Sequence, residues 1–286
     1  MLNDANFEVV EQYYYKLAPT LLCRAPMVAS KSFLLRYSQG LSPTKLLPAF
    51  MHYEHRRMDL KKSEEAKKYT ENRKDELGDS LKVGSSSSMS DGFEVRIDSP
   101  PHQVGSFVDD DSASIKYLEG VIKLGCRSGA IFSYLVALYA AMEDEEPLLR
   151  FLSVHVPSAA VATDATQKAL LAGSYADEGV SSPLDMSFAL RRILSTGRHF
   201  RSAVKLYMGF GMRVQAVELA LKVDPSLARD LARKSTDDDE RKRLWLMIAK
   251  NAAGAGGGKD VVSKVVAVLR DCGPDVLSIE DVLPFL

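Results

Sequence analysis

The sequence predicts an all-α fold in which short helical hairpins follow one another along the chain. Hydrophobic residues recur every three to four positions through the C-terminal half, which is the period of an amphipathic helix. Gly, Pro and capping residues interrupt that pattern after roughly ten to fifteen residues at a time. No two segments show the alternation of apolar and polar residues that paired β-strands require. Hairpins in series form either a helical bundle or an α-solenoid.

Composition and charge exclude several classes of protein. Of the 286 residues, 46% are hydrophobic, which is enough to bury a core and excludes a chain disordered throughout. The 37 Lys and Arg residues are balanced by 38 Asp and Glu residues, so overall positive charge cannot be the basis of nucleic-acid binding. The sequence begins without the basic start and apolar run of a signal peptide, and no apolar stretch reaches the roughly 18 residues that span a bilayer. Cys23, Cys126 and Cys272 are too few and too far apart for a disulfide framework or a zinc site, so we expect a soluble protein of the reducing cytosol.

The middle of the chain differs in composition from both ends. Between residues 54 and 82, 17 of 29 residues are charged, so a solvated helix is possible there but nothing obliges it to pack on a core. Between residues 83 and 111, 12 of 29 residues are Gly, Ser or Pro, which cannot offset the entropy of ordering them. The predicted domains are N-terminal solenoid helices over 1–53, a disordered insertion over 54–111, and an α-solenoid over 112–286 with a loop at 153–183.

The first three helices after residue 185 are bounded by glycine and proline. A hydrophobic stripe begins at Met186 and stops at the Thr196-Gly197 pair, and a second begins at Phe200. A third ends at Asp224-Pro225, because the residue before proline is disfavoured in a helix and proline suits the first turn of the next one. The stripe residues are Met186, Ala189, Leu190, Ile193 and Leu194, then Phe200, Val204 and Tyr207, then Val214, Val217 and Leu221.

Two further helices complete the pattern. Thr236 and Asp239 stand at capping-box spacing before a helix that contains Trp245. The Gly-rich run at 254–258 breaks the chain, and hydrophobic residues then continue at helical spacing over 261–269. That last segment is rich in valine, so a strand competes with a helix, and the helical period favours the helix.

Weak self-similarity favours the solenoid over the bundle. Aligning Tyr139 with Tyr207 also places Val136 on Val204 and Leu138 on Leu206. The offset of 68 residues corresponds to two helical hairpins of about 34 residues each, a length typical of helical repeats.

None of the motifs that resemble a catalytic or cofactor site is complete. The run from Gly254 to Lys259 resembles a phosphate-binding loop, but Ala253 and Asp260 stand where that motif requires glycine and a hydroxyl residue. His52 and His55 stand three residues apart, but they are not part of a complete set of metal ligands, and ordinary surface histidines are the simpler interpretation. We therefore predict no catalytic residue, no cofactor and no metal, and we rank a binding module above an enzyme.

One charged segment is a candidate binding surface. Residues 186–234 contain ten basic and three acidic residues, a local net charge of +7. A solvated polar face explains this by default, because Lys and Arg stems often cover apolar surface. The functional alternatives are an acidic protein surface, a phosphoinositide headgroup and RNA, of which RNA is the weakest because the aromatic residues lie mostly on the apolar stripe. The candidate protein-interaction residues are Arg191, Arg198, Arg201 and Arg213.

Several segments carry a family resemblance. Residues 277–285 read LSIEDVLPF and 244–249 read LWLMIA, while 216–224 have a recurrent helix-turn pattern. Residues 46–50 (LLPAF) and 115–119 (IKYLE) flank the predicted insertion. Together these segments resemble the deep orange family, the vacuolar protein sorting eighteen subunits, in which the last two pieces lie nearly contiguous. The segment 277–285 is the specific one, and the others are generic for helical repeats.

The resemblance implies a fold and a cellular role. It implies a clathrin-heavy-chain-like α-solenoid in the HOPS and CORVET tethering complexes, which bring late endosomes, vacuoles or lysosomes together and support SNARE-dependent fusion. The implied partners are other tethering-complex subunits and SNARE-binding or Rab-binding proteins, with peripheral membrane association through the complex and no nucleic acid. Family members usually also carry a β-propeller and a zinc-binding RING domain. Neither is found here, so we expect a fragment or an incomplete gene model and carry over no zinc or ubiquitin-ligase function.

Two alternatives remain open. A helical coat or nuclear-pore scaffold would share the repeats but not the signature over 279–285. An enzyme of unknown type would require a pocket with clustered, strongly perturbed acids or histidines.

Overall fold

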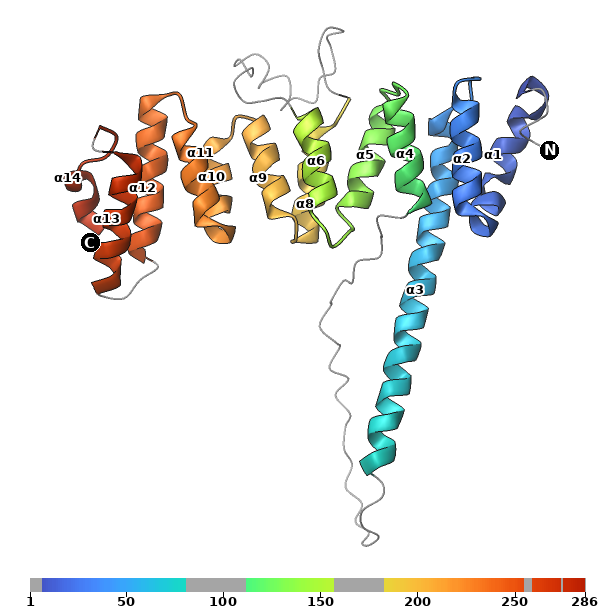
Figure 1. Ribbon diagram of the computed structural model, residues 1–286, viewed down its shortest axis with the longest axis horizontal. Helices are drawn as coiled ribbons and strands as arrows, with labels where there is room; N and C mark the ends of the chain where they lie inside the picture. The colour runs from blue at the N-terminus through green and yellow to red at the C-terminus, as the bar shows by residue number, and fades with distance from the viewer. Residues whose placement is uncertain (1–6, 81–111, 157–182, 255–258, 274, 286) are drawn as a thin grey trace, which may run out of the picture. The chain divides into compact units, whose positions relative to one another are not determined.

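The computed structural model describes residues 7–80, 112–156, 183–254, 259–273 and 275–285 (Figure 1). All the regular secondary structure in these ranges is helical, which confirms the predicted all-α class. The chain divides into two compact units, residues 1–131 with 141–143 and residues 132–140 with 144–286. None of the described helices combines the length and the hydrophobicity needed to cross a membrane.

The first unit packs its helices around aromatic side chains. Phe33 is fully buried and meets the rings of Tyr14, Phe50 and Tyr117 edge-on, with ring centroids 6.1 to 6.3 Å apart. Each ring comes from a different helix, so this cluster holds the unit together, and edge-to-face pairs of this kind stabilise beyond the area that they bury. The helices are α1 (Phe7–Arg24), α2 (Pro26–Tyr37), α3 (Pro43–Ser80) and α4 (Ala113–Lys123).

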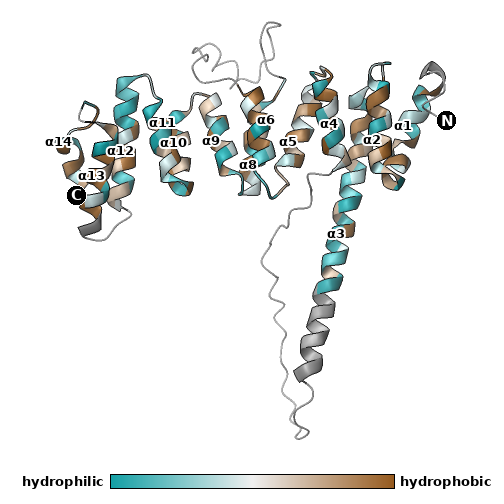
Figure 2. Cartoon of the chain, in the orientation of Figure 1, coloured by the Kyte–Doolittle hydropathy of each residue, from teal (hydrophilic) through white to brown (hydrophobic). Residues whose placement is uncertain are grey.

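Helix α3 runs well past the predicted end of the N-terminal helices. Its first turns bury Leu46, Leu47 and Phe50, whereas the described side chains after residue 54 are mostly exposed and hydrophilic (Figure 2). Residues 54–80 are therefore helical, which agrees with the solvated helix considered for this segment and not with its assignment to a disordered insertion, while residues 81–111 lie outside the described part of the chain. Lys and Glu are strong helix formers, and the packed N-terminal turns supply the nucleus from which the charged sequence propagates.

A buried polar contact joins the two sides of the predicted insertion. Ser112 immediately precedes α4, but its hydroxyl does not cap that helix and instead donates to Glu54 Oε1 of α3 at 2.5 Å. Both residues are buried, and Arg57 lies 3.6 Å from the other carboxylate oxygen of Glu54. The ends of the intervening segment are thus fixed to the same core.

The second unit is a series of short helices in which each hairpin packs on the next. Helix α9 packs on α8 and α10, α10 on α11 and α12, and α12 on α13. This is the arrangement of an α-solenoid, in which stacking neighbours bury a continuous core. The elements are α5 (Gly129–Tyr139, mostly in this unit), α6 (Glu146–His155), α8 (Met186–Thr196), α9 (Phe200–Gly209), α10 (Arg213–Val223), α11 (Pro225–Arg233), α12 (Asp238–Gly254), α13 (Lys259–Cys272), α14 (Ile279–Val282) and the 3-10 helix Leu283–Phe285.

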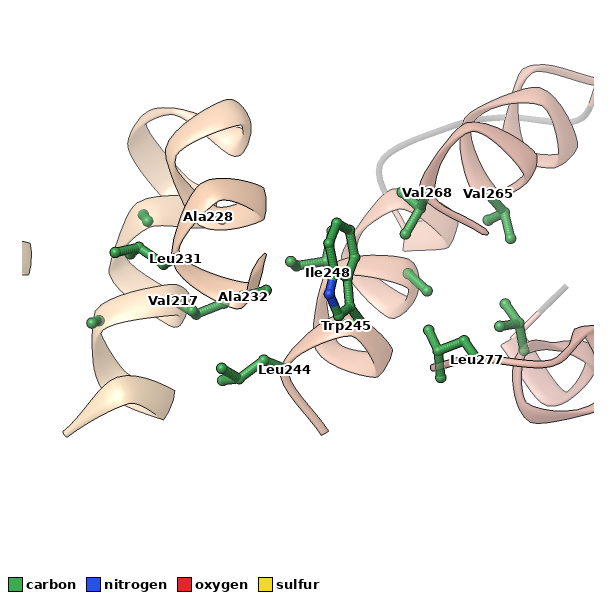
Figure 3. Packing of buried hydrophobic residues seen from close by; sticks show 14 of the residues in the cluster. Val217, Ala228, Leu231, Ala232, Leu244, Trp245, Ile248, Val265, Val268 and Leu277 are labelled. Carbon is green, nitrogen blue, oxygen red and sulfur yellow. The ribbon is translucent and has the colours of Figure 1, made fainter. Parts of the chain in front are cut away.

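Trp245 lies at the centre of the C-terminal core of this unit (Figure 3). Its side chain is 1% exposed, and the same cluster contains Leu231 of α11, Val265 and Val268 of α13, and Leu277. Because those valines bury at helical spacing in α13, the helix predicted over 261–269 is confirmed and the competing strand is excluded.

Some predicted boundaries are confirmed and others are displaced. Gly197 ends α8 in the left-handed conformation with φ 65°, as the Thr196-Gly197 pair predicted. The predicted cap of α12 was wrong by one residue, because Asp237, and not Thr236, accepts the backbone N–H of Glu240 at 3.1 Å. Helix α6 continues to His155, so the first residues of the predicted 153–183 loop are helical, and residues 157–182 lie outside the described ranges.

Candidate protein-interaction surface

The described side chains offer no metal centre. In the ranges that the structure covers, no three His, Cys, Asp or Glu side chains are grouped so that they could hold a metal ion. His52 and His55 both lie exposed on α3, and His55 pairs with Asp59 at 3.5 Å one helical turn away. The remaining candidate site is the cationic segment over residues 186–234.

The four predicted arginines lie on three successive helices and one turn. Arg191 is exposed on α8, and Arg198 is half-buried in the turn between α8 and α9. Arg201 is exposed on α9, and Arg213 is the first residue of α10 and is half-buried. They share one unit but differ in their contacts, because Arg201 and Arg213 have carboxylate partners and Arg191 and Arg198 have none among the described residues.

Helix α8 presents its arginines because its opposite face is buried. The Asp185 carboxylate caps the helix by accepting the Phe188 backbone N–H at 2.9 Å. Met186, Ala189 and Ile193 face the core. Arg191 and Arg192 fall on the other side of the 3.6-residue repeat and are both exposed.

Helix α9 is capped by a side chain from another helix pair. His199 contributes no side-chain cap, and the Glu145 carboxylate accepts the Ser202 backbone N–H at 2.7 Å instead. The carboxylate also suits the positive end of the helix dipole. Since Ser202 and Leu206 are buried, Arg201 and Lys205 lie on the face that points away from the core.

Arg201 is held by an acid of the next hairpin. Its Nη2 lies 3.4 Å from Asp224 Oδ2, and Asp224 is the residue that caps α11. The Ser226 hydroxyl and backbone N–H both donate to the Asp224 carboxylate, which lowers the pKa of that carboxyl, with a smaller contribution from Arg201. Arg201 thus has an intramolecular partner but remains largely in solvent.

Arg213 belongs to a polar network between α10 and α12. Its guanidinium pairs with Glu240, and the Ser235 hydroxyl donates to the same carboxylate oxygen at 2.9 Å. Arg241 donates from Nε to the Ser235 carbonyl at 3.0 Å. The side chains of Arg213 and Glu240 are only 19% and 24% exposed, so Arg213 fastens two hairpins together and is not available to a partner.

The remaining ion pairs between hairpins also join a cation to a carboxylate that lies later in the sequence. Arg229 and Arg233 of α11 lie 2.9 and 3.8 Å from Asp271 of α13. Lys242 of α12 lies 3.0 Å from Asp281 of α14. In each of these ion pairs, as in Arg201 with Asp224 and Arg213 with Glu240, the cation comes earlier in the sequence and the carboxylate comes later. Electrostatic attraction therefore links each hairpin to its successor.

Six of the ten cations in residues 186–234 have no ion pair among the described residues, and four of these six lie on α8, on α9 or in the turn between them. These four are Arg191, Arg192, Arg198 and Lys205, and we call them the α8–α9 cationic surface. Sequence reasoning counted Arg192 and Lys205 in the charged segment but did not select them. The sequence marks this region by the lack of any Asp or Glu between residues 186 and 217, but Arg201 and Arg213 of the same range pair with acids further along the chain.

The C-terminal signature is explained largely by packing and capping. Leu277 and Val282 are buried in the Trp245 core. Ser278 and Asp281 form a reciprocal capping box for α14. The Ser278 backbone N–H and the Lys242 ammonium lower the pKa of Asp281. Of this segment, only Ile279 and Leu283 leave large hydrophobic side chains exposed.

Comparisons with known proteins agree with this architecture. A family model described as "VPS18, alpha-solenoid domain, second half" matches residues 101–253, more than half of the chain. The chain is 36% identical over 175 residues to "Vacuolar sorting protein 18" of Arabidopsis thaliana, an alignment that covers 60% of this chain and 16% of that protein. It is 33% identical over 185 residues to "Vacuolar protein sorting-associated protein 18 homolog" of Danio rerio, covering 64% and 16%. The homologue of Drosophila melanogaster is 28% identical over 173 residues, covering 59% and 14%. The chain therefore spans about a sixth of the length of these relatives.

Proposed function

The chain belongs to the VPS18 family, and from this premise we propose that it is a scaffold subunit of a complex that tethers endosomal and vacuolar or lysosomal membranes. In this role it supports vesicle docking, SNARE-dependent fusion and vacuolar protein sorting by binding proteins and not by catalysis. The observation that carries the proposal is the family match over helices α4 to α12, on a unit built of stacked hairpins.

The stacked hairpins suit a scaffold for physical reasons. Each hairpin buries its apolar face against a neighbour, so the surface grows with the number of repeats while the core stays continuous. The directed ion pairs between successive hairpins, such as Arg213 with Glu240, resist sliding of one hairpin on the next. Such an arm can hold bound proteins at fixed separations, which is what docking two membranes requires.

We propose that this chain binds the partners that the role of its family implies. They are other subunits of the tethering complex and proteins that bind SNAREs or Rabs. Association with the late endosome, vacuole or lysosome is peripheral in this proposal and takes place through the complex. No cofactor or catalytic residue is part of it.

Affinity purification tests the proposal. We expect the tagged full chain, expressed in its source organism, to co-purify other vacuolar sorting subunits as identified by mass spectrometry. Ala232→Asp places a charge at a fully buried position and should abolish the association. The matched control Ala267→Asp changes an exposed alanine of α13 and should preserve it. Recovery of coat or nuclear-pore subunits without sorting subunits would contradict the proposal and favour the coat-like alternative.

A further inference from the structure

The α8–α9 cationic surface concentrates positive charge that the fold leaves without an ion-pair partner. Arg191 and Arg192 are exposed, and Arg198 and Lys205 are half-buried. Arg201 lies on α9, which packs on α8, and its side chain remains 59% exposed even though it approaches Asp224. Nowhere between residues 186 and 217 does the sequence supply an acidic side chain that could neutralise this charge locally.

Stabilisation of the helices themselves does not account for these cations. Basic residues stabilise a helix through its dipole only in the last turn, and neither α8 nor α9 has a basic residue in its last turn. The carboxylate of Glu145 caps the start of α9 by accepting the Ser202 backbone N–H, and it forms no ion pair with these cations. These cations therefore make no evident contribution to the stability of the unit.

Four other arginines of the same unit show what such a group binds. Arg201, Arg213, Arg229 and Arg233 each pair with an Asp or Glu of a following hairpin. The planar guanidinium matches a carboxylate with two parallel donors, which is why arginine is favoured over lysine at interfaces of this kind. Three of the four members of the α8–α9 cationic surface are arginines.

We propose that the α8–α9 cationic surface binds an acidic segment of a partner protein, with carboxylates that take the place that Asp and Glu of the next hairpin occupy elsewhere in the unit. This proposal deepens the proposed scaffold function and rests on it, since a scaffold needs partners. Arg191, Arg192 and Arg198 make the principal contacts, and Lys205 and the exposed part of Arg201 extend the surface along α9.

The surroundings of the surface favour a protein over a membrane or RNA. A helix that lies in a membrane interface needs a broad apolar face, and within α8 and α9 the only large hydrophobic side chain that is exposed is Leu194. RNA binding needs aromatic rings on which bases stack, and Phe188, Phe200 and Tyr207 are all half-buried. Charge complementarity is therefore the main basis for binding at this surface, and the carboxylates of an acidic protein segment supply the opposite charge.

Binding of a labelled acidic peptide to the full chain tests the proposal. The probe is a fluorescein-labelled peptide rich in Glu and Asp, and its reference is the same peptide with Gln and Asn, both followed by fluorescence anisotropy. The triple variant Arg191→Glu, Arg192→Glu, Arg198→Glu should weaken binding of the acidic peptide about tenfold or more, because it replaces attraction by repulsion. Since none of these side chains pairs within the described structure, circular dichroism should show an unchanged fold.

The matched control separates a local surface from overall charge. Arg243→Glu, Lys264→Glu, Arg270→Glu makes the same change in net charge at exposed positions of α12 and α13. It should weaken binding less than about twofold at 0.15 M salt, where charges more than about 8 Å apart are screened. Equal losses in both triple variants, or equal binding of the acidic and the Gln/Asn peptides, would overturn the proposal.

Two further arms test the rejected partners. The same proteins are mixed, in separate experiments, with vesicles that contain phosphatidylinositol phosphates and with single-stranded RNA. Tighter binding to either than to the acidic peptide, lost in the triple variant, would overturn the assignment to a protein. Failure here is distinguishable from failure of the proposed function, because co-purification with sorting subunits is measured separately and can succeed through other surfaces.

Discussion

Trp245 joins three helices through one side chain. It projects from α12 into the core formed with α11, α13 and Leu277 (Figure 3). Trp245→Ala should lower the free energy of unfolding by about 3 to 5 kcal/mol, because the truncation removes buried apolar surface and leaves a cavity. Chemical denaturation followed by circular dichroism measures this. Arg243→Ala, an exposed neighbour on the same helix, is the control and should be nearly neutral; a neutral Trp245→Ala would show that this tryptophan is not a core residue.

His155 should make stability depend on pH. Its ring lies 4.5 Å from the centroid of Phe151 and 5.0 Å from that of Phe132, and burial lowers the pKa of His155 below its usual value of 6.5. Between the two pKa values the unfolded chain binds more protons than the folded one, so the free energy of unfolding should fall as the pH drops below about 6.5.

His155→Phe should remove that dependence, because the aromatic packing is retained and the titrating group is lost. Denaturation at a series of pH values between neutrality and mild acid measures the effect. His52→Phe, on the exposed face of α3, should keep the dependence of the unaltered chain. A His155→Phe chain that loses stability over the same pH range as before would contradict the assignment.

At the scale of elements, the contact between α10 and α12 depends on a half-buried ion pair. Arg213→Met should lower the free energy of unfolding by about 1 to 3 kcal/mol, because Glu240 keeps the Ser235 hydroxyl but loses its cation. A double-mutant cycle with Glu240→Leu should give a coupling above about 0.5 kcal/mol. The exposed pair Arg233 and Asp230 is the control cycle and should couple by less than that. Equal couplings would show that the half-buried pair does not join the hairpins.

The charged part of α3 should be separable from the first unit. Replacing residues 64–106 by a short Gly-Ser linker keeps Glu54, Arg57 and Ser112, which are the groups that join α3 to the start of α4. The helical circular dichroism should fall with the removed turns, while the thermal midpoint of the rest should hardly change. A marked drop in that midpoint would show that the charged turns stabilise the core. A linker variant with Glu54→Gln tests the buried contact itself, and we expect it to melt at a lower temperature than the linker chain.

Across the whole molecule, periodic elements were predicted well and their lateral contacts were not. The stripe from Met186 to Ile193 and the valines of α13 follow directly from helical spacing, and both helices are present with those residues buried. The end of α3 was missed because the charged sequence has no apolar stripe, and only its attachment to packed turns explains the helix. Asp237 was missed as a cap because Thr236 fits the same spacing pattern one residue earlier.

The candidate surface was predicted only in outline. Local composition identified the positive segment, but it could not show which arginines have partners, since Asp224 and Glu240 lie 23 and 27 residues from Arg201 and Arg213. That distinction removed Arg213 from the candidate surface and brought Arg192 and Lys205 into it.

The sequence by itself determined the all-α class, the main helix boundaries and the family resemblance, because helical periodicity, glycine and proline act over a few neighbouring residues. Only the tertiary structure decided which charges are used within the unit and which face outward. The physical reason is that an ion pair depends on distances of about 4 Å between side chains, and stacking of hairpins sets those distances between residues far apart in the chain.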